Sequence, residues 1–139
     1  MSYAHILIAT DMSENCQQLI SKAFALNGKV SLIHVIEPLT MALGADIPID
    51  LGLLQQQQHE KAEARLQQLL EQYPELKKEQ CFLRTGQPRQ DIHQLAQEQS
   101  CDLIVVGSHG RHGLALLFGS TTNDILSRAP CDILAVAIK

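Results

Sequence analysis

Short runs of apolar residues alternate along the chain with longer stretches in which apolar residues recur every three or four positions. The short runs are typical of buried strands, and the longer stretches are typical of helices that cover one face of a sheet. The runs predict strands over residues 4–10, 29–35, 81–84, 102–106 and 131–138. The periodic stretches predict helices over about 14–27, over 51–73, from Pro88 onward and from Gly119 to about 128.

Residues 36–50 show no clean period and are predicted to form a loop. Polar and imino residues mark the ends of the predicted helices. Asp11 and Ser13 are expected to cap the first helix, because their side chains accept hydrogen bonds from the free N–H groups of a first turn. Pro74 is expected to end the second helix, and Pro130 the last one.

This alternation predicts βαβ units and therefore a parallel sheet. Five such strands with right-handed crossovers fold as an open doubly wound sheet with helices on both faces, in one domain over residues 1–139. Ligands of such sheets bind beyond the carboxyl ends of the strands, where the winding reverses. Two predicted strand ends carry residues suited to binding a ligand, namely Ala9–Asp11 and Gly107–Gly110.

The segment Val106–Gly113 resembles a phosphate-binding loop. Glycines after a buried strand let backbone N–H groups approach a ligand that a Cβ would repel. Gly119, Ser120 and Thr121 then open a helix whose first N–H groups favour an anion. The alternative is that these glycines serve only tight turns and that Ser120 or Thr121 only caps the helix.

Composition narrows the choice of ligand and location. The chain has 139 residues, of which 45% are hydrophobic and 19% charged, and its net charge is −4. An acidic surface does not attract nucleic acid or an anionic membrane, so neither is expected as a partner. No stretch approaches the ~20 apolar residues that a membrane span needs, and the apolar start reaches Asp11 too soon for a signal peptide. We therefore expect a cytoplasmic protein.

Taken together, the motifs resemble the universal stress protein family along nearly the whole chain. The resemblance rests on segments that occur in the family's order: 6–14, 32–35, Gly86–Pro88, Gly107–Arg111, Gly119–Thr122 and 129–136. It implies the sheet order 3-2-1-4-5, which places the first and fourth strands side by side. Asp11 would then lie beside the glycine loop.

The resemblance also implies ATP as the ligand, with or without Mg²⁺, because family members with the glycine motif bind ATP. The adenosine side of the implied pocket comprises Ala9, Thr10, Asp11 and the backbone of Val35. Val106 and Gly107 form its floor. The phosphate side comprises Gly110, Arg111, Gly119, Ser120 and Thr121. For Asp11 a capping role is the alternative, and for Arg111 a solvated position on the loop.

One departure concerns the spacing of the glycines. The family's usual pattern has nine residues before the Gly-Ser or Gly-Thr pair, whereas eight separate Gly110 from Gly119 here. A deletion of one residue is expected to move the loop by about an ångström, enough to alter phosphate contacts. Alternatively, Gly113 absorbs the difference by adopting a positive φ.

The leading interpretation is an ATP-binding stress-response protein that acts as a nucleotide-dependent sensor or adaptor for an unidentified regulatory partner. Fast hydrolysis is not expected, because the chain has no Gly-x-x-x-x-Gly-Lys-[Ser/Thr] loop. The alternatives are an interaction protein of the same fold that binds no nucleotide, and a slow ATPase. A homodimer is expected through the apolar C-terminal strand 132–138, which the implied order leaves at a sheet edge.

Overall fold

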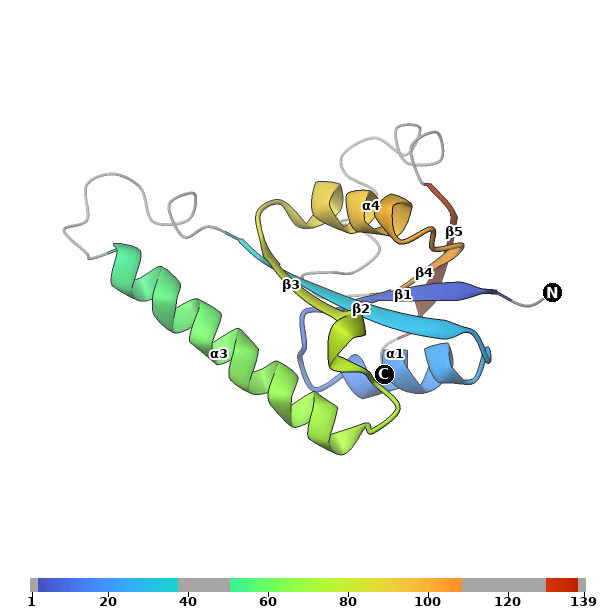
Figure 1. Cartoon of the computed structure of the whole chain (residues 1–139), viewed down its shortest axis with the longest axis horizontal. Coiled ribbons are helices and arrows are strands. Elements are labelled where there is room, and N and C mark those ends of the chain that lie inside the picture. Colours follow the sequence, from blue (N-terminus) through green and yellow to red (C-terminus); the bar gives the residue numbers. More distant parts are fainter. Residues whose placement is uncertain (1–2, 38–50, 109–129, 138–139) are drawn as a thin grey trace.

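The computed structural model describes residues 3–37, 51–108 and 130–137. Its centre is a five-stranded parallel sheet with the order β3-β2-β1-β4-β5, as predicted (Figure 1). The strands are β1 (His5–Ala9), β2 (Lys29–Ile36), β3 (Cys81–Thr85), β4 (Leu103–Gly107) and β5 (Asp132–Val136). The strands predicted from the apolar runs are therefore confirmed, with the fifth shorter than expected.

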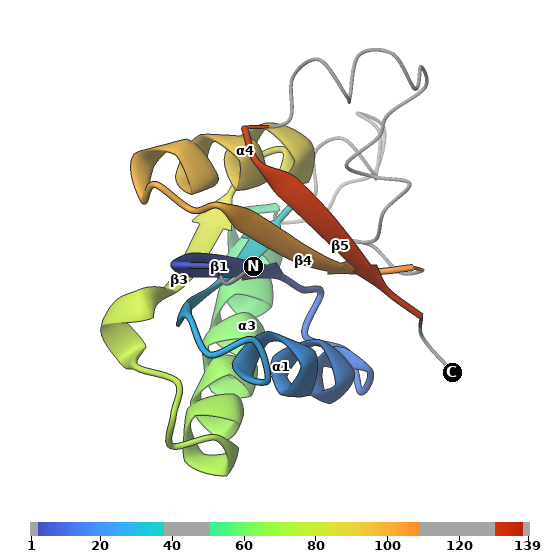
Figure 2. The same cartoon turned by 90° about the vertical axis from the view of Figure 1, so that its right-hand side faces the viewer.

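Helices cover both faces of the sheet, which also confirms the prediction. The helices in the described ranges are α1 (Cys16–Phe24), α3 (Leu51–Gln72), α4 (Pro88–Glu98) and the short 3₁₀ helix η1 (Lys78–Gln80). Helices α1 and α3 lie on one face and α4 on the other (Figures 1 and 2). The doubly wound architecture follows from this arrangement.

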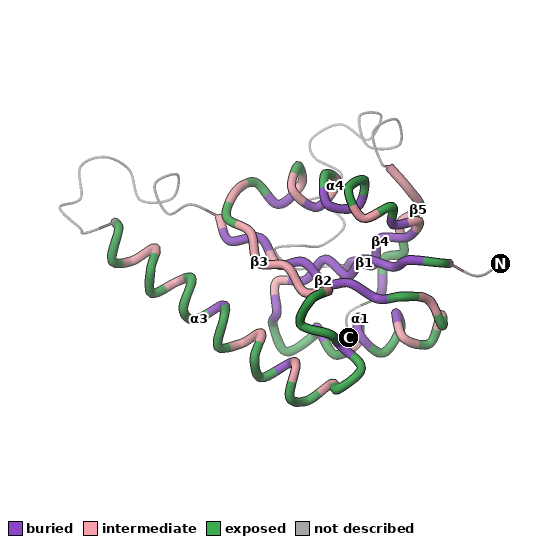
Figure 3. Tube along the Cα trace, in the orientation of Figure 1, coloured by how far each residue is buried: buried purple, intermediate pink, exposed green. Residues whose placement is uncertain are grey.

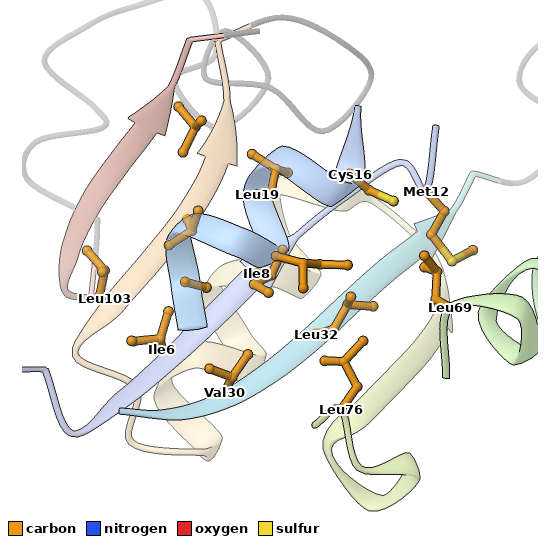
Figure 4. Close-up of a cluster of buried hydrophobic side chains, with 14 of the residues drawn as sticks. Ile6, Ile8, Met12, Cys16, Leu19, Val30, Leu32, Leu69, Leu76 and Leu103 are labelled. Atoms are coloured by element: carbon orange, nitrogen blue, oxygen red, sulfur yellow. The ribbon is translucent and has the colours of Figure 1, made fainter. Parts of the chain in front are cut away.

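The two faces of the sheet bury separate apolar clusters, because successive side chains of a strand point to opposite faces. Ile6 and Ile8 of β1 pack toward α1 and α3, whereas Leu7 and Ala9 pack toward α4. All four side chains are fully buried. Figure 3 shows the buried residues concentrated in the central strands, and Figure 4 shows the cluster under α1 and α3. Strand β1 therefore contributes to both apolar clusters, and all five of its residues are buried.

The turn from β3 into α4 depends on Gly86. The Gly86 N–H donates to Ile36 O at 3.0 Å, and a Cβ at this position would require the Asp91 carboxylate to move. Pro88 follows at the first turn of α4, where its missing N–H costs nothing. The Gly86–Pro88 motif is thus explained by packing and helix initiation.

Two sequence predictions need correction, and two others lie wholly or mostly outside the described residues. The first helix begins at Cys16 rather than near residue 14, and its N-cap residue Asn15 makes no side-chain capping bond. The fifth strand runs from Asp132 to Val136 rather than over 131–138. The predicted helix from Gly119 to about 128 and most of the predicted loop over 36–50 lie outside the described residues.

The described helices bear on membrane insertion. None of them combines the length and apolar character needed to cross a membrane.

Candidate functional site

The carboxyl ends of the three central strands, β1, β2 and β4, lie next to one another at one end of the sheet. Strand β1 pairs with both neighbours, with Ala9 beside Ile33 and Ile8 beside Val105. The Thr10 N–H continues the ladder by donating to Ile33 O at 3.1 Å. The winding of the sheet reverses between β1 and β4, so this is the edge where doubly wound folds bind ligands.

Six of the sequence-predicted site residues lie around these three strand ends: Ala9, Thr10, Asp11, Val35, Val106 and Gly107. Gly110, Arg111, Gly119, Ser120 and Thr121 lie outside the described residues. The described part of the site is therefore the part assigned to adenosine and to the pocket floor.

The described site residues divide by what they can offer a ligand. Thr10 is 1% exposed, and the Ala9, Val35 and Val106 side chains are packed into the core cluster under α4. These residues present backbone groups rather than side chains to the sheet edge. The Asp11 side chain is half-buried and reaches the surface. A backbone-lined floor with one carboxylate suits the hydroxyl and amine groups of a nucleoside, because a carboxylate accepts their hydrogen bonds.

The loop after β1 is held by its own side chains. Thr10 Oγ1 accepts a hydrogen bond from the Met12 N–H at 2.9 Å, and Asp11 Oδ1 accepts one from the Ser13 N–H at 2.9 Å. The expected capping role of Asp11 and Ser13 is therefore wrong, because the Asp11 carboxylate closes an Asx turn before the helix begins. This hydrogen bond fixes the orientation of the Asp11 carboxylate in the loop that follows β1.

A histidine on the neighbouring strand supports the same loop. His34 Nδ1 lies 2.9 Å from Thr10 O, so this ring nitrogen carries the proton and donates to the carbonyl. This hydrogen bond connects the loop after β1 to β2. His34 is half-buried rather than fully buried.

Met12 has an unusual backbone conformation for its residue type. Its φ is 59°, in the left-handed region, which costs a residue with a Cβ about 1–2 kcal/mol. Its side chain is 5% exposed and belongs to the cluster under α1 and α3, where it points toward Leu69 (Figure 4). Burial of a methionine side chain contributes about 1.5–3 kcal/mol, which is enough to offset the strain.

Sequence reasoning missed a contact from α3 to this loop. Arg65 Nε donates to Met12 O at 2.9 Å, and Arg65 Nη2 lies 3.7 Å from Cys16 Sγ at the start of α1. Burial raises the pKa of the Cys16 thiol, although the nearby Arg65 charge acts in the opposite direction. The guanidinium therefore faces a carbonyl and a neutral thiol.

Metal binding has no separate centre in the described ranges, where no three His, Cys, Asp or Glu side chains gather closely enough to hold an ion. Mg²⁺ at this site would therefore depend on nucleotide phosphates for several of its ligands, as Mg²⁺ commonly does.

The sheet order and the position of the loops define a doubly wound α/β protein with a candidate ligand site at its switch point. The family model for the universal stress protein family matches residues 2–137. The chain therefore belongs to this family. It is 38% identical to universal stress protein A homolog 1 of Coxiella burnetii, and the match covers 100% of this chain and 99% of that protein.

Two solved structures share the fold. The hypothetical protein MJ0577 has a TM-score of 0.75 at 22% identity, covering 100% of this chain and 99% of that one. A universal stress protein in complex with cAMP has a TM-score of 0.55 at 21% identity, with 98% of each chain covered. At these identities the likeness concerns the fold.

Proposed function

We propose that this protein binds ATP at the junction of β1 and β4 and acts as a nucleotide-dependent sensor or adaptor in a cytoplasmic stress response. The observation that carries the proposal is the half-buried Asp11 carboxylate, fixed by the Ser13 N–H in the loop that follows β1, the strand that pairs with β4. Membership of the universal stress protein family supports it. So does the adenine nucleotide cAMP in the complex of a protein with the same fold.

In this proposal the described residues bind the nucleoside part. Asp11 accepts hydrogen bonds from the ribose hydroxyls or the base, with Ala9 and Thr10 beside it. The backbone of Val35 meets adenine, and Val106 and Gly107 form the floor. Gly110, Arg111, Gly119, Ser120 and Thr121 hold the phosphates, with backbone N–H groups favouring the negative charge. The whole chain over 1–139 forms this one domain.

Calorimetry with ATP, ADP and adenosine at one salt concentration tests the proposal. We expect the parent protein to bind ATP more tightly than adenosine, because the phosphates gain contacts that adenosine lacks. An absence of ATP binding by the parent protein overturns the proposal. Adenosine that binds as tightly as ATP shows instead that the glycine loop holds no phosphate.

Substitution of Asp11 tests the nucleoside side. Asp11→Asn keeps a side-chain oxygen for the Ser13 N–H and removes only the charge, so the loop is preserved while the ligand contact is weakened. We expect a loss of ATP affinity of about fivefold, since hydrogen bonds to charged groups exceed neutral ones by roughly 1 kcal/mol. Asp132→Asn, at the opposite end of the sheet, is the matched control and should bind as the parent does.

We also propose a homodimer formed through β5. This strand lies at the edge of the sheet, and Leu134 on it is 37% exposed. An apolar edge strand with unpaired backbone groups is suited to pairing with a second copy about a two-fold axis. Free thiols at all four cysteines are typical of a reducing compartment and support the cytoplasmic location.

A further inference from the structure

Met12 differs from the other described residues with a left-handed backbone. Asn27 and Ser100 have φ values of 60° and 54° and follow α1 and α4, where such residues commonly end a helix. Met12 instead follows a strand, directly after the carboxylate proposed to meet the nucleoside. Strained backbone that the surrounding structure maintains is concentrated at functional sites.

The Met12 conformation is held from three directions. Thr10 Oγ1 receives its N–H at 2.9 Å, its side chain is buried in the core, and its carbonyl receives Arg65 Nε at 2.9 Å. The first contact comes from Thr10, directly after β1, and the second from the core cluster under α1 and α3. The third comes from α3, 53 residues further along the chain.

The Arg65 guanidinium connects three parts of the molecule. Besides the Met12 carbonyl, it reaches Gln68 Oε1 at 3.3 Å on its own helix and Cys16 Sγ at 3.7 Å on α1. A planar guanidinium with several donors fixes the direction of each contact better than a flexible amine does. The Met12 carbonyl is consequently held at a set position relative to α1 and α3.

We propose that Arg65 is a positioning residue for the nucleotide site, which holds the Met12 carbonyl and thereby keeps Asp11 in its binding orientation. The inference rests on the proposed ATP binding. Asp11 and Met12 share a peptide bond, so rotation of the Met12 backbone out of the left-handed region redirects the Asp11–Ser13 turn. Apparent affinity falls in proportion to the fraction of molecules with the loop in the competent conformation.

The attachment of α3 does not depend on this hydrogen bond. Ala62 and Leu69 of α3 are buried in the cluster under α1, and Leu66 packs against the same cluster. Arg65 lies beside this apolar stripe and is only half-buried. Loss of its donor is therefore expected to change the loop more than the fold.

Two uncharged variants of equal length isolate the donor. In Arg65→Gln the amide nitrogen stands as many bonds from the backbone as Arg65 Nε, so an N–H for the Met12 carbonyl is kept. In Arg65→Met a methyl group takes that place and no donor remains. Both residues are good helix formers, so α3 is preserved. Lys61→Met, on the exposed face of α3, controls for loss of a positive charge from this helix.

ATP affinity is measured by calorimetry at a temperature where circular dichroism shows all variants folded. We expect Arg65→Met to bind about tenfold more weakly than the parent, since an unsatisfied carbonyl and a freed loop act together. The ATP affinity of Arg65→Gln should remain within about threefold of the parent's, as expected when the donor is kept. The affinity of Lys61→Met should equal that of the parent. In the ATP-free proteins, the amide resonances of Met12 and Ser13 should move in Arg65→Met and stay in place in Arg65→Gln.

The outcomes separate the two proposals. A parent protein that binds no ATP overturns the proposed function and, with it, this role of Arg65. A parent that binds ATP, with equal affinity in the Met and Gln variants, overturns the role of Arg65 alone. A weaker Arg65→Met whose loop resonances match those of the parent also overturns it, because the effect would not pass through the loop.

Discussion

The Asp102 carboxylate accepts a hydrogen bond from the backbone N–H of His5 at 3.0 Å, which joins the starts of β4 and β1 at the sheet edge opposite the candidate site. The same carboxylate accepts the Ala4 N–H at 2.8 Å, and the Asp102 N–H donates to His5 O at 2.9 Å. The two strands that carry the candidate site at one end are thus connected reciprocally at the other. The parallel pairing of β1 and β4, with Ile8 beside Val105, brings the carboxyl ends of both strands to the candidate site.

This clamp predicts sensitivity to acid. Hydrogen bonds from the Ala4 and His5 N–H groups lower the pKa of the Asp102 carboxyl in the folded protein. The Asp102 contribution to stability is therefore complete above the unfolded-state pKa of about 4 and is lost as pH falls through the lower folded-state pKa. Asp102→Asn should lower the free energy of unfolding at neutral pH by about 1 kcal/mol. The free energy of unfolding of this variant should also fall less steeply than the parent's as the pH is lowered.

Urea unfolding followed by circular dichroism between neutral pH and the acid range measures both effects. Glu71→Gln, exposed on α3, is the control carboxylate and should leave the curve unchanged. An Asp102→Asn protein with the parent's full acid dependence would falsify this assignment.

A second prediction concerns the buried hydroxyl of Ser31. His5 Nδ1 donates to Gln99 O at 2.9 Å, His5 Nε2 lies 2.6 Å from Ser31 Oγ, and the Ser31 hydroxyl is 2.8 Å from Gln80 Oε1. Ser31 is fully buried, so water cannot replace it. Ser31→Ala should therefore destabilise the protein by about 1–3 kcal/mol, because buried polar groups lose their partner.

The measurement is the free energy of unfolding in urea, with Ser21→Ala on the exposed face of α1 as the matched control. That control should stay within about 0.5 kcal/mol of the parent. Equal stability of the two variants would show that the hydrogen bonds of Ser31 with His5 and Gln80 make no net contribution to the free energy of unfolding.

Strands β1, β2 and β4 were predictable because each is a run of apolar residues buried on both faces of the sheet. The shorter β3 and the edge strand β5 are less buried, but their apolar runs still indicated strands. The loop after β1 was not predictable, since Asp11 and Ser13 have the chemistry of helix caps and also of an Asx turn. The left-handed backbone of Met12 distinguishes the Asx turn from a helix cap, and no residue type near Met12 predicts that conformation. The contact of Arg65 with the Met12 carbonyl was not predictable, because Arg65 flanks the apolar stripe of α3, where a charged residue ordinarily points to solvent.

A third prediction concerns the phosphate side of the site and rests on the sequence pattern. Gly110→Val places a side chain where the backbone is expected to approach phosphate, and should weaken ATP binding at least roughly tenfold, about 1.4 kcal/mol. Adenosine affinity should change much less. Gly52→Val, exposed in the first turn of α3, carries the same substitution away from the site and should bind ATP normally. Calorimetry with both ligands distinguishes these results, and equal ATP affinity in the two variants places the phosphates elsewhere.

The last prediction tests the proposed dimer through the backbone of β5. The Ser108 N–H donates to Val136 O at 2.9 Å, so Val136 directs its backbone groups toward β4. Backbone direction alternates along a strand, and the N–H of Ala135 therefore points away from β4, to the side on which the proposed dimer would pair.

Ala135→Pro removes this outward N–H while leaving the β4 ladder intact, because proline is tolerated at an edge where the N–H faces solvent. Ala135→Thr alters the same exposed side chain and keeps the donor. We expect light scattering at micromolar concentration to find the parent and Ala135→Thr dimeric and Ala135→Pro shifted toward monomer. A monomeric parent, or a proline variant as dimeric as the parent, would show that β5 does not form the interface. Unchanged ATP affinity in a monomeric Ala135→Pro would further show that each copy holds a complete site, as expected if the nucleotide lies at the β1–β4 junction.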